Sequence, residues 1–150
     1  MSKNALIGIA GVHYVVSELS RRGIVALPTT KNIAAYDIVA LNSEGTGHAN
    51  IQVKASSRRV ADFPMPPADR VRAGSKDFYV FVRWLEKEKR YQGFLLTGKQ
   101  AKRAVEEACD RQQKNINYGK RKKLFPTVHV GNQQSKDAKC WEENWENWRL

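Results

Sequence analysis

The sequence has few cysteines, few histidines and no long hydrophobic run, and each shortage excludes a class of protein. Two cysteines, Cys109 and Cys140, in 150 residues cannot form the disulfide framework of a small secreted domain. The cysteines and three histidines have none of the close spacings of a structural zinc site. No apolar segment approaches the roughly 20 residues that a membrane helix needs. We therefore expect a soluble, cytoplasmic protein that contacts no membrane.

The chain is strongly basic, and its excess charge is spread along its whole length. It has 26 lysines and arginines against 15 aspartates and glutamates, a formal charge of +11. Residues 1–60, 61–110 and 111–150 have net charges of +4, +2 and +5. This distribution favours a polyanionic partner, and nucleic acid is the leading candidate. The length suits one domain that spans residues 1–150.

Hydrophobic periodicity predicts helices at both ends of a series of strands. Apolar residues recur at helical spacing over residues 4–22, and Gly23 is suited to end that helix. Thr97 and Gln100 have the spacing of a capping box, which predicts a second helix that runs to about Gln112. Strands are predicted at residues 24–27, 36–41, 49–55, 78–84, 91–96 and 127–130. This order predicts one α/β domain with helices packed against a mixed sheet.

Residues 56–75 hold three of the five prolines, which predicts a long surface loop. The segment also has four arginines, at positions 58, 59, 70 and 72, and a second basic cluster is the run at residues 120–123. Basic side chains of this kind can contact phosphates in a salt-dependent manner. The residues expected to hold a nucleic-acid backbone are Arg58, Arg59, Lys76, Lys120, Arg121, Lys122 and Lys123.

A candidate site lies where two predicted strands form a hairpin. Side chains alternate along a strand, so Gln52 and Lys54 share one face and Val53 points to the other. If the hairpin closes around Gly45, Asp37 lies roughly opposite Lys54. One carboxylate, one amide oxygen and one ammonium group would then gather on one face. Such a set can hold a divalent cation and orient a water molecule.

Residues 36–40 (YDIVA) and 51–55 (IQVKA) resemble the PD-(D/E)XK nuclease superfamily, in particular the members with a Gln-x-Lys motif. The resemblance implies a restriction-endonuclease-like αβββαβ core, in which helices flank a mixed β-sheet. It also implies that Asp37 and Gln52 bind Mg²⁺ or Mn²⁺ together with the backbone carbonyl of Val53. In the same way, Lys54 would assist catalysis.

The sequence departs from this family in two places. Gln52 is neutral, so the site has one negative charge fewer and should hold Mg²⁺ more weakly. Many relatives have a glutamate directly after a glycine of the first helix, whereas Val12 follows Gly11 here. Glu18 is the nearest acid and therefore a candidate catalytic residue. Its competing interpretation is an ion pair with Arg22, one helical turn away.

Three functions are consistent with these observations. The first is a metal-dependent endonuclease that hydrolyses DNA phosphodiester bonds. The second is a nucleic-acid-binding module that retains the nuclease fold without its activity. The third is a structural subunit that assembles through the tryptophans at positions 141, 145 and 148. The absence of a separate recognition domain favours structure-directed or nonspecific DNA binding, with a homodimer as one arrangement.

Overall fold

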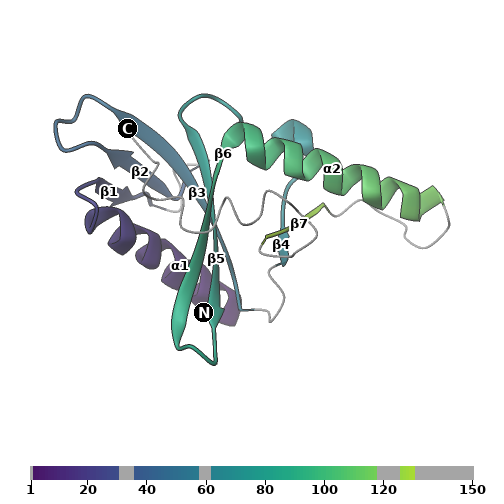
Figure 1. The fold of residues 1–150 in the computed structure, drawn as a ribbon, viewed down its shortest axis with the longest axis horizontal. Helices are drawn as coiled ribbons and strands as arrows, with labels where there is room; N and C mark the ends of the chain where they lie inside the picture. Colours follow the sequence, from purple (N-terminus) through teal and green to yellow (C-terminus); the bar gives the residue numbers. More distant parts are fainter. Residues whose placement is uncertain (1, 31–35, 58–61, 118–125, 131–150) are drawn as a thin grey trace.

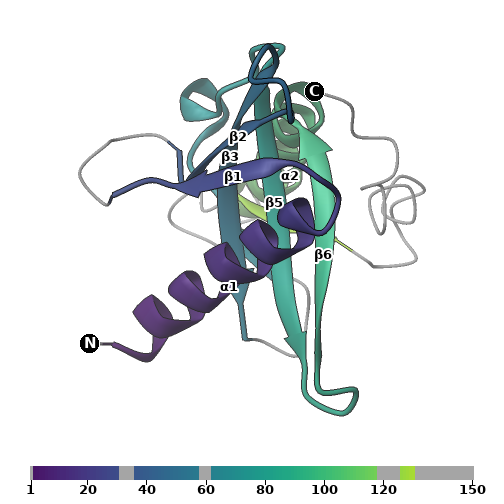
Figure 2. The ribbon, with the colours of Figure 1, turned by 90° about the vertical axis from the view of Figure 1, so that its left-hand side faces the viewer.

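Five strands form one mixed sheet, and a helix lies against each of its faces (Figures 1 and 2). The computed structural model describes residues 2–30, 36–57, 62–117 and 126–130. Strands β1 and β2 and strands β2 and β3 pair antiparallel, β3 and β5 pair parallel, and β5 and β6 pair antiparallel. The predicted α/β class, a mixed sheet flanked by helices, is confirmed. In spatial order the strands are β1 (Val25–Pro28), β2 (Ile38–Leu41), β3 (His48–Ser56), β5 (Asp77–Leu85) and β6 (Arg90–Thr97).

Helix α1 (Lys3–Ser20) covers one face of the sheet. It begins at a serine cap, where the Ser2 hydroxyl accepts a hydrogen bond from the backbone N–H of Ala5 (3.3 Å). It ends at Ser20, three residues before Gly23, whose φ of +76° lets the chain turn so that the N–H of Ile24 donates to the carbonyl of Leu19 (3.1 Å). The predicted apolar stripe faces the sheet. The buried residues of this layer are Val15, Leu19, Ile38, Ala40, Ala49, Ile51, Val80, Val82 and Leu95.

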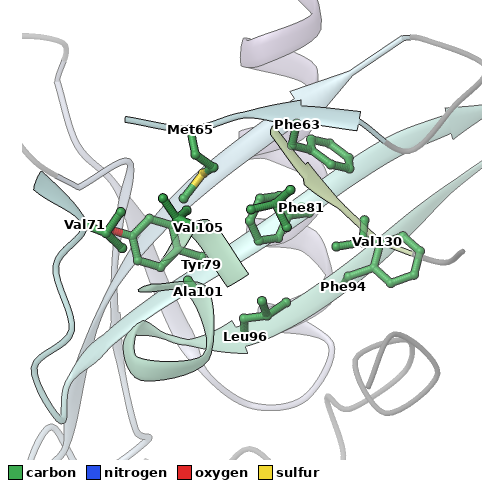
Figure 3. Close-up of a cluster of buried hydrophobic side chains, with 11 residues drawn as sticks. Phe63, Met65, Val71, Tyr79, Phe81, Phe94, Leu96, Ala101, Val105 and Val130 are labelled. Carbon is green, nitrogen blue, oxygen red and sulfur yellow. The ribbon is translucent and has the colours of Figure 1, made fainter. Parts of the chain in front are cut away.

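Helix α2 (Gly98–Asn117) covers part of the other face. The predicted capping box is present: the N–H of Gln100 donates to the Thr97 hydroxyl (3.3 Å), and the N–H of Thr97 donates to the Gln100 side chain (2.9 Å). The buried residues beneath α2 include Phe81, Phe94 and Val105, and they form a second core over β5 and β6 (Figure 3). Among the described residues, no helix is both long enough and apolar enough to cross a membrane.

The prediction of one long loop at residues 56–75 is wrong. This segment holds a short strand, β4 (Asp62–Pro64), and a 3₁₀ turn, η1 (Ala68–Arg70). Strand β4 pairs antiparallel with β7 (Thr127–His129), so the predicted last strand belongs to a separate two-stranded ribbon and not to the main sheet. The proline content favoured a surface loop, but Phe63 and Met65 are buried in the core beneath α2 and anchor this ribbon.

Candidate functional site

Strand β3 places its polar side chains on the face that α2 partly covers. Gln52 is paired with Tyr79 of β5, and Lys54 is paired with Phe81. Paired residues on parallel strands point to the same face, and both partners belong to the core beneath α2. Val53 lies between them and packs with the residues beneath α1. The predicted alternation is therefore present, with Gln52 and Lys54 on one face.

Asp37 lies beside the same two residues, but not in the predicted register. The last pair between β2 and β3 is Ile38 with Ile51. Beyond it, the backbone N–H of Asp37 donates to the carbonyl of Ile51 (2.9 Å), so Asp37 lies beside Ile51 and Gln52 and not opposite Lys54. The turn causes the difference, because it is centred between residues 44 and 45. The hydrogen bonds that close it include one from the backbone N–H of Asn42 to the Gly47 carbonyl (3.1 Å) and one from the N–H of Gly47 to the Asn42 side chain (3.1 Å).

The carboxylate of Asp37 takes the place of a strand partner. Strand β2 begins only at Ile38, and beyond it the Asp37 Oδ2 atom accepts a hydrogen bond from the backbone N–H of Val53 (2.7 Å). The N–H and C=O groups of one strand residue point to the same side of the strand. The Val53 carbonyl therefore faces the same side of β3 as the carboxylate. This arrangement brings together two kinds of oxygen that magnesium prefers.

Lys54 is half-buried beside this carboxylate. Burial lowers the pKa of its ammonium group below the ordinary value for lysine, and the negative charge of Asp37 opposes that shift without cancelling it. A lysine with a lowered pKa gives up its proton more easily than a solvated lysine. The side chain can therefore act in proton transfer as well as in charge stabilisation.

Three residues that the sequence analysis did not assign to the site extend this group of side chains. Arg72 donates a hydrogen bond from its Nη1 atom to the Tyr36 hydroxyl (2.6 Å), and its guanidinium carbon lies 4.8 Å from the centre of the Tyr36 ring. The backbone N–H of Arg72 donates to the Tyr79 hydroxyl (3.0 Å). No local pattern could have found these contacts, because Tyr36 and Arg72 are 36 positions apart in the chain.

Glu18 does not join the site. It lies on α1, which packs against the opposite face of the sheet, and its carboxylate pairs with Arg21 (3.0 Å) and Arg22 (2.6 Å). The interpretation of Glu18 as an ion-pair partner of Arg22 is confirmed. These contacts do not support its assignment as a catalytic residue, since the other candidate side chains lie on the far side of the sheet.

The basic residues expected to contact phosphates are only partly described. Lys76 is exposed just before β5, where its backbone carbonyl accepts a hydrogen bond from the N–H of Asn50 (2.8 Å). It therefore lies at the end of the sheet where β5 begins, near Tyr79. Arg58, Arg59, the run at residues 120–123 and the C-terminal tryptophans lie outside the described residues.

The described ranges contain no cluster of three or more histidine, cysteine, aspartate or glutamate side chains that could hold a metal ion. The candidate site instead offers one carboxylate, one side-chain amide and one backbone carbonyl, from Asp37, Gln52 and Val53. Three protein oxygens with a single negative charge suit a cation that keeps several waters and binds substrate phosphates at the same time. The donor set therefore fits magnesium or manganese better than zinc.

The mixed five-stranded sheet with a helix on each face is an α/β fold that a solved nuclease structure shares. The solved structure of a bacterial homing endonuclease, I-Ssp6803I, is similar, with a TM-score of 0.57 and 15% sequence identity. The similarity covers 98% of this chain and 91% of that chain. No protein-family model matches the sequence. No curated protein matches it either. At this level of identity, the similarity establishes the fold.

Proposed function

We propose that this protein is a metal-dependent endonuclease that hydrolyses DNA phosphodiester bonds. The observation that carries the proposal is the position of Asp37, Gln52 and Lys54 on one face of the sheet, with the Asp37 carboxylate held against the backbone of Val53. Two further observations support it. A homing endonuclease has the same fold, and the net charge of +11 favours a polyanionic substrate.

Asp37, Gln52 and the carbonyl of Val53 would hold Mg²⁺ or Mn²⁺. A bound cation would lower the pKa of a coordinated water and neutralise charge on the phosphoryl oxygens. The hydrogen bond from the Val53 N–H occupies only one of the two carboxylate oxygens of Asp37 and fixes the orientation of the group. The role of this bond is thus to keep the second oxygen in place before substrate binds.

Lys54 would take up a proton from the attacking water or stabilise the negative charge that develops on the phosphoryl oxygens. Its burial lowers its pKa, which raises the fraction of neutral amine at a given pH relative to an exposed lysine. Lys76, Arg58, Arg59 and the run at residues 120–123 would contact the DNA backbone. We also predict that the protein forms a homodimer and is located in the cytoplasm.

The test is cleavage of supercoiled plasmid and of single-stranded DNA in the presence of Mg²⁺ or Mn²⁺. We expect the wild-type protein to nick the plasmid and the Lys54→Ala variant to leave it intact. Lys87→Ala is a matched control, because Lys87 is an exposed lysine in the turn after β5, at the far end of that strand from Tyr79. Nicking by Lys54→Ala at the rate of the control would contradict the proposed mechanism.

A second candidate function is a binding module that has lost its chemistry. The observation that favours it is that Asp37 supplies one carboxylate to the site and no second one joins it from the described part of the chain, because Glu18 is paired with two arginines at the opposite face. This candidate predicts salt-sensitive DNA or RNA binding without metal-dependent turnover. Calorimetric titration with Mn²⁺ separates the two functions. Tight binding that is lost in Asp37→Ala would support the enzyme and count against the module.

A further inference from the structure

The Arg72 guanidinium lies at the candidate site without belonging to the predicted set of ligands. Tyr79, Gln52 and Asp37 lie on three adjacent chain segments: Gln52 pairs with Tyr79, and on the other side of β3 Asp37 bonds to Ile51 and Val53, the residues before and after Gln52. Arg72 contacts Tyr79 at one end of this row and, beside the other end, the residue that precedes Asp37. Its backbone N–H bonds to Tyr79, and its side chain bonds to Tyr36, which directly precedes Asp37. The arginine therefore links the chain segments that carry Tyr79 and Asp37.

The first residue of α2 packs closely against the segment that carries Arg72. A Cβ atom added to Gly98, the first residue of α2, would lie 2.7 Å from the Arg72 carbonyl oxygen and 2.8 Å from the Ala73 Cα atom. Two residues further on, the N–H of Gly74 donates to the carboxylate of Asp77 (2.9 Å). This close packing fixes the backbone of the segment. The arginine consequently loses less conformational entropy on binding a ligand than one on an unsupported loop.

The side chain of Arg72 is exposed and oriented so that it can bind an anion. It forms no ion pair with a carboxylate in the described ranges. One of its N–H groups is used by the Tyr36 hydroxyl, while the stacked ring sets the plane of the guanidinium. A guanidinium has five N–H donors in a fixed fork that matches phosphate oxygens. The remaining donors can therefore meet a phosphate with little rearrangement.

We propose that Arg72, oriented by Tyr36, binds a backbone phosphate of the nucleic-acid strand that passes the candidate site. This inference deepens the proposed function and rests on it only for the class of ligand. Arg72 is the residue that touches the strand, and Tyr36 is a positioning residue that acts through it. The contact adds affinity in a sequence-independent manner, because it reads a phosphate and not a base.

The test measures binding of a short fluorescent DNA duplex by anisotropy at several salt concentrations, with EDTA present so that no cleavage occurs. We expect Arg72→Ala to weaken binding about tenfold at low salt and to reduce the slope of log K against log salt by about one. Arg70→Ala is the matched control, because Arg70 is exposed in the same segment and its loss changes the net charge equally. We expect this control to change binding by less than about twofold.

The positioning role of Tyr36 has its own readout. Tyr36→Leu should weaken binding in the wild-type background and have no effect in the Arg72→Ala background, because the ring acts only through the arginine. Tyr36→Phe keeps the ring and should retain most of the affinity. Equal effects of Tyr36→Leu in both backgrounds would contradict this role.

Two results would overturn the inference: wild-type binding by Arg72→Ala, or an equal loss in Arg70→Ala, which would indicate net charge alone. Failure of the endonuclease proposal gives a different result. Wild-type protein would then bind DNA and show the Arg72 effect, yet nick no plasmid with any metal. Absence of DNA binding by the wild-type protein would overturn both.

Discussion

On β3, Ile51 and its neighbour Gln52 point to opposite faces of one sheet and have opposite environments. Ile51 is fully buried beneath α1 among aliphatic side chains, whereas Gln52 is half-buried next to Asp37. The apolar face supplies the burial that stabilises the strand. The polar face contributes little to that burial, so substitutions there affect stability less and its residues are free to form a binding or catalytic site. One strand thus serves both stability and the candidate site, and the division follows from side-chain alternation alone.

The face that holds the site is itself divided. Over β5 and β6, α2 and the β4–β7 ribbon cover a core of large residues such as Phe81 and Phe94 (Figure 3). In the register of β2 and β3, the same face has Asp37, Gln52 and Lys54. Gln52 and Lys54 lie on β3 beside this core, whereas Asp37 precedes β2 and is held by its hydrogen bond from Val53. If the apolar face supplies stability and the polar face supplies the candidate site, substitutions on the two faces should have different effects.

The largest expected effect is on catalysis. Lys54→Met should reduce plasmid cleavage at least about 100-fold, because it removes the proposed proton-transfer group while keeping a long unbranched side chain. The same change should raise the free energy of unfolding, since burial disfavours the charged lysine. Cleavage assays and urea denaturation of one preparation measure both effects. A variant that is less stable than wild type would show that Lys54 supports the fold.

The next effect is on stability and concerns the apolar face. Ile51→Ala should lower the free energy of unfolding by about 2–5 kcal/mol, because it leaves a cavity in a fully buried position. Gln52→Ala, on the other face, should cost less than about 1 kcal/mol. Urea denaturation of both variants checks this contrast. Equal losses would break the division between the two faces.

A smaller effect is expected where α1 touches β3. A Cβ atom on Gly11 would lie 2.6 Å from the Ala55 Cβ atom, whereas a Cβ atom on Gly8 would meet no atom within 4 Å. Gly11→Ala should therefore cost about 1–3 kcal/mol through overpacking. Gly8→Ala should stabilise the helix by about 0.5–1 kcal/mol. Thermal unfolding of the two variants measures the difference, and opposite signs are the expected result.

The smallest effect is the dependence of stability on pH. The pKa of Lys54 is lower in the folded state, so the unfolded chain binds more protons between the folded and unfolded pKa values. The destabilisation due to Lys54 is fully present below this alkaline window and disappears as the pH rises through it. The stability gap between Lys54→Met and wild type should therefore narrow over the same range. Denaturation at several alkaline pH values measures the gap, and a constant gap would contradict the lowered pKa.

Much of the fold could be predicted because its signals are local. The apolar stripe that includes Val15 and Leu19, the capping box at Thr97 and the alternation of β3 each depend on residues a few positions apart. Strand β4 and its partner β7 could not be predicted in this way. Both strands are three residues long, and Phe63 is paired with Val128, far away in the sequence. Their stability comes from the core that both enter.

The relative positions of the candidate site residues were predicted only in part. The face shared by Gln52 and Lys54 follows from alternation, but the position of Asp37 depends on the hydrogen bonds of the Asn42–Gly47 turn. The contact between Tyr36 and Arg72 depends on how distant segments pack, which no local spacing encodes. Glu18 was a candidate because of its distance along the helix, and the ion pairs with its neighbours explain it instead.

The bond from the Val53 N–H to Asp37 has an evolutionary consequence. The carboxylate serves both as the end of the β2–β3 ladder and as the acidic group of the candidate site. A related protein that bound DNA without cleaving it would still need a hydrogen-bond acceptor for the Val53 N–H group. An asparagine side chain supplies that acceptor without the negative charge. Selection that relaxes on catalysis should therefore replace Asp37 with asparagine before alanine. The residue at this position would then distinguish active lineages from inactive ones.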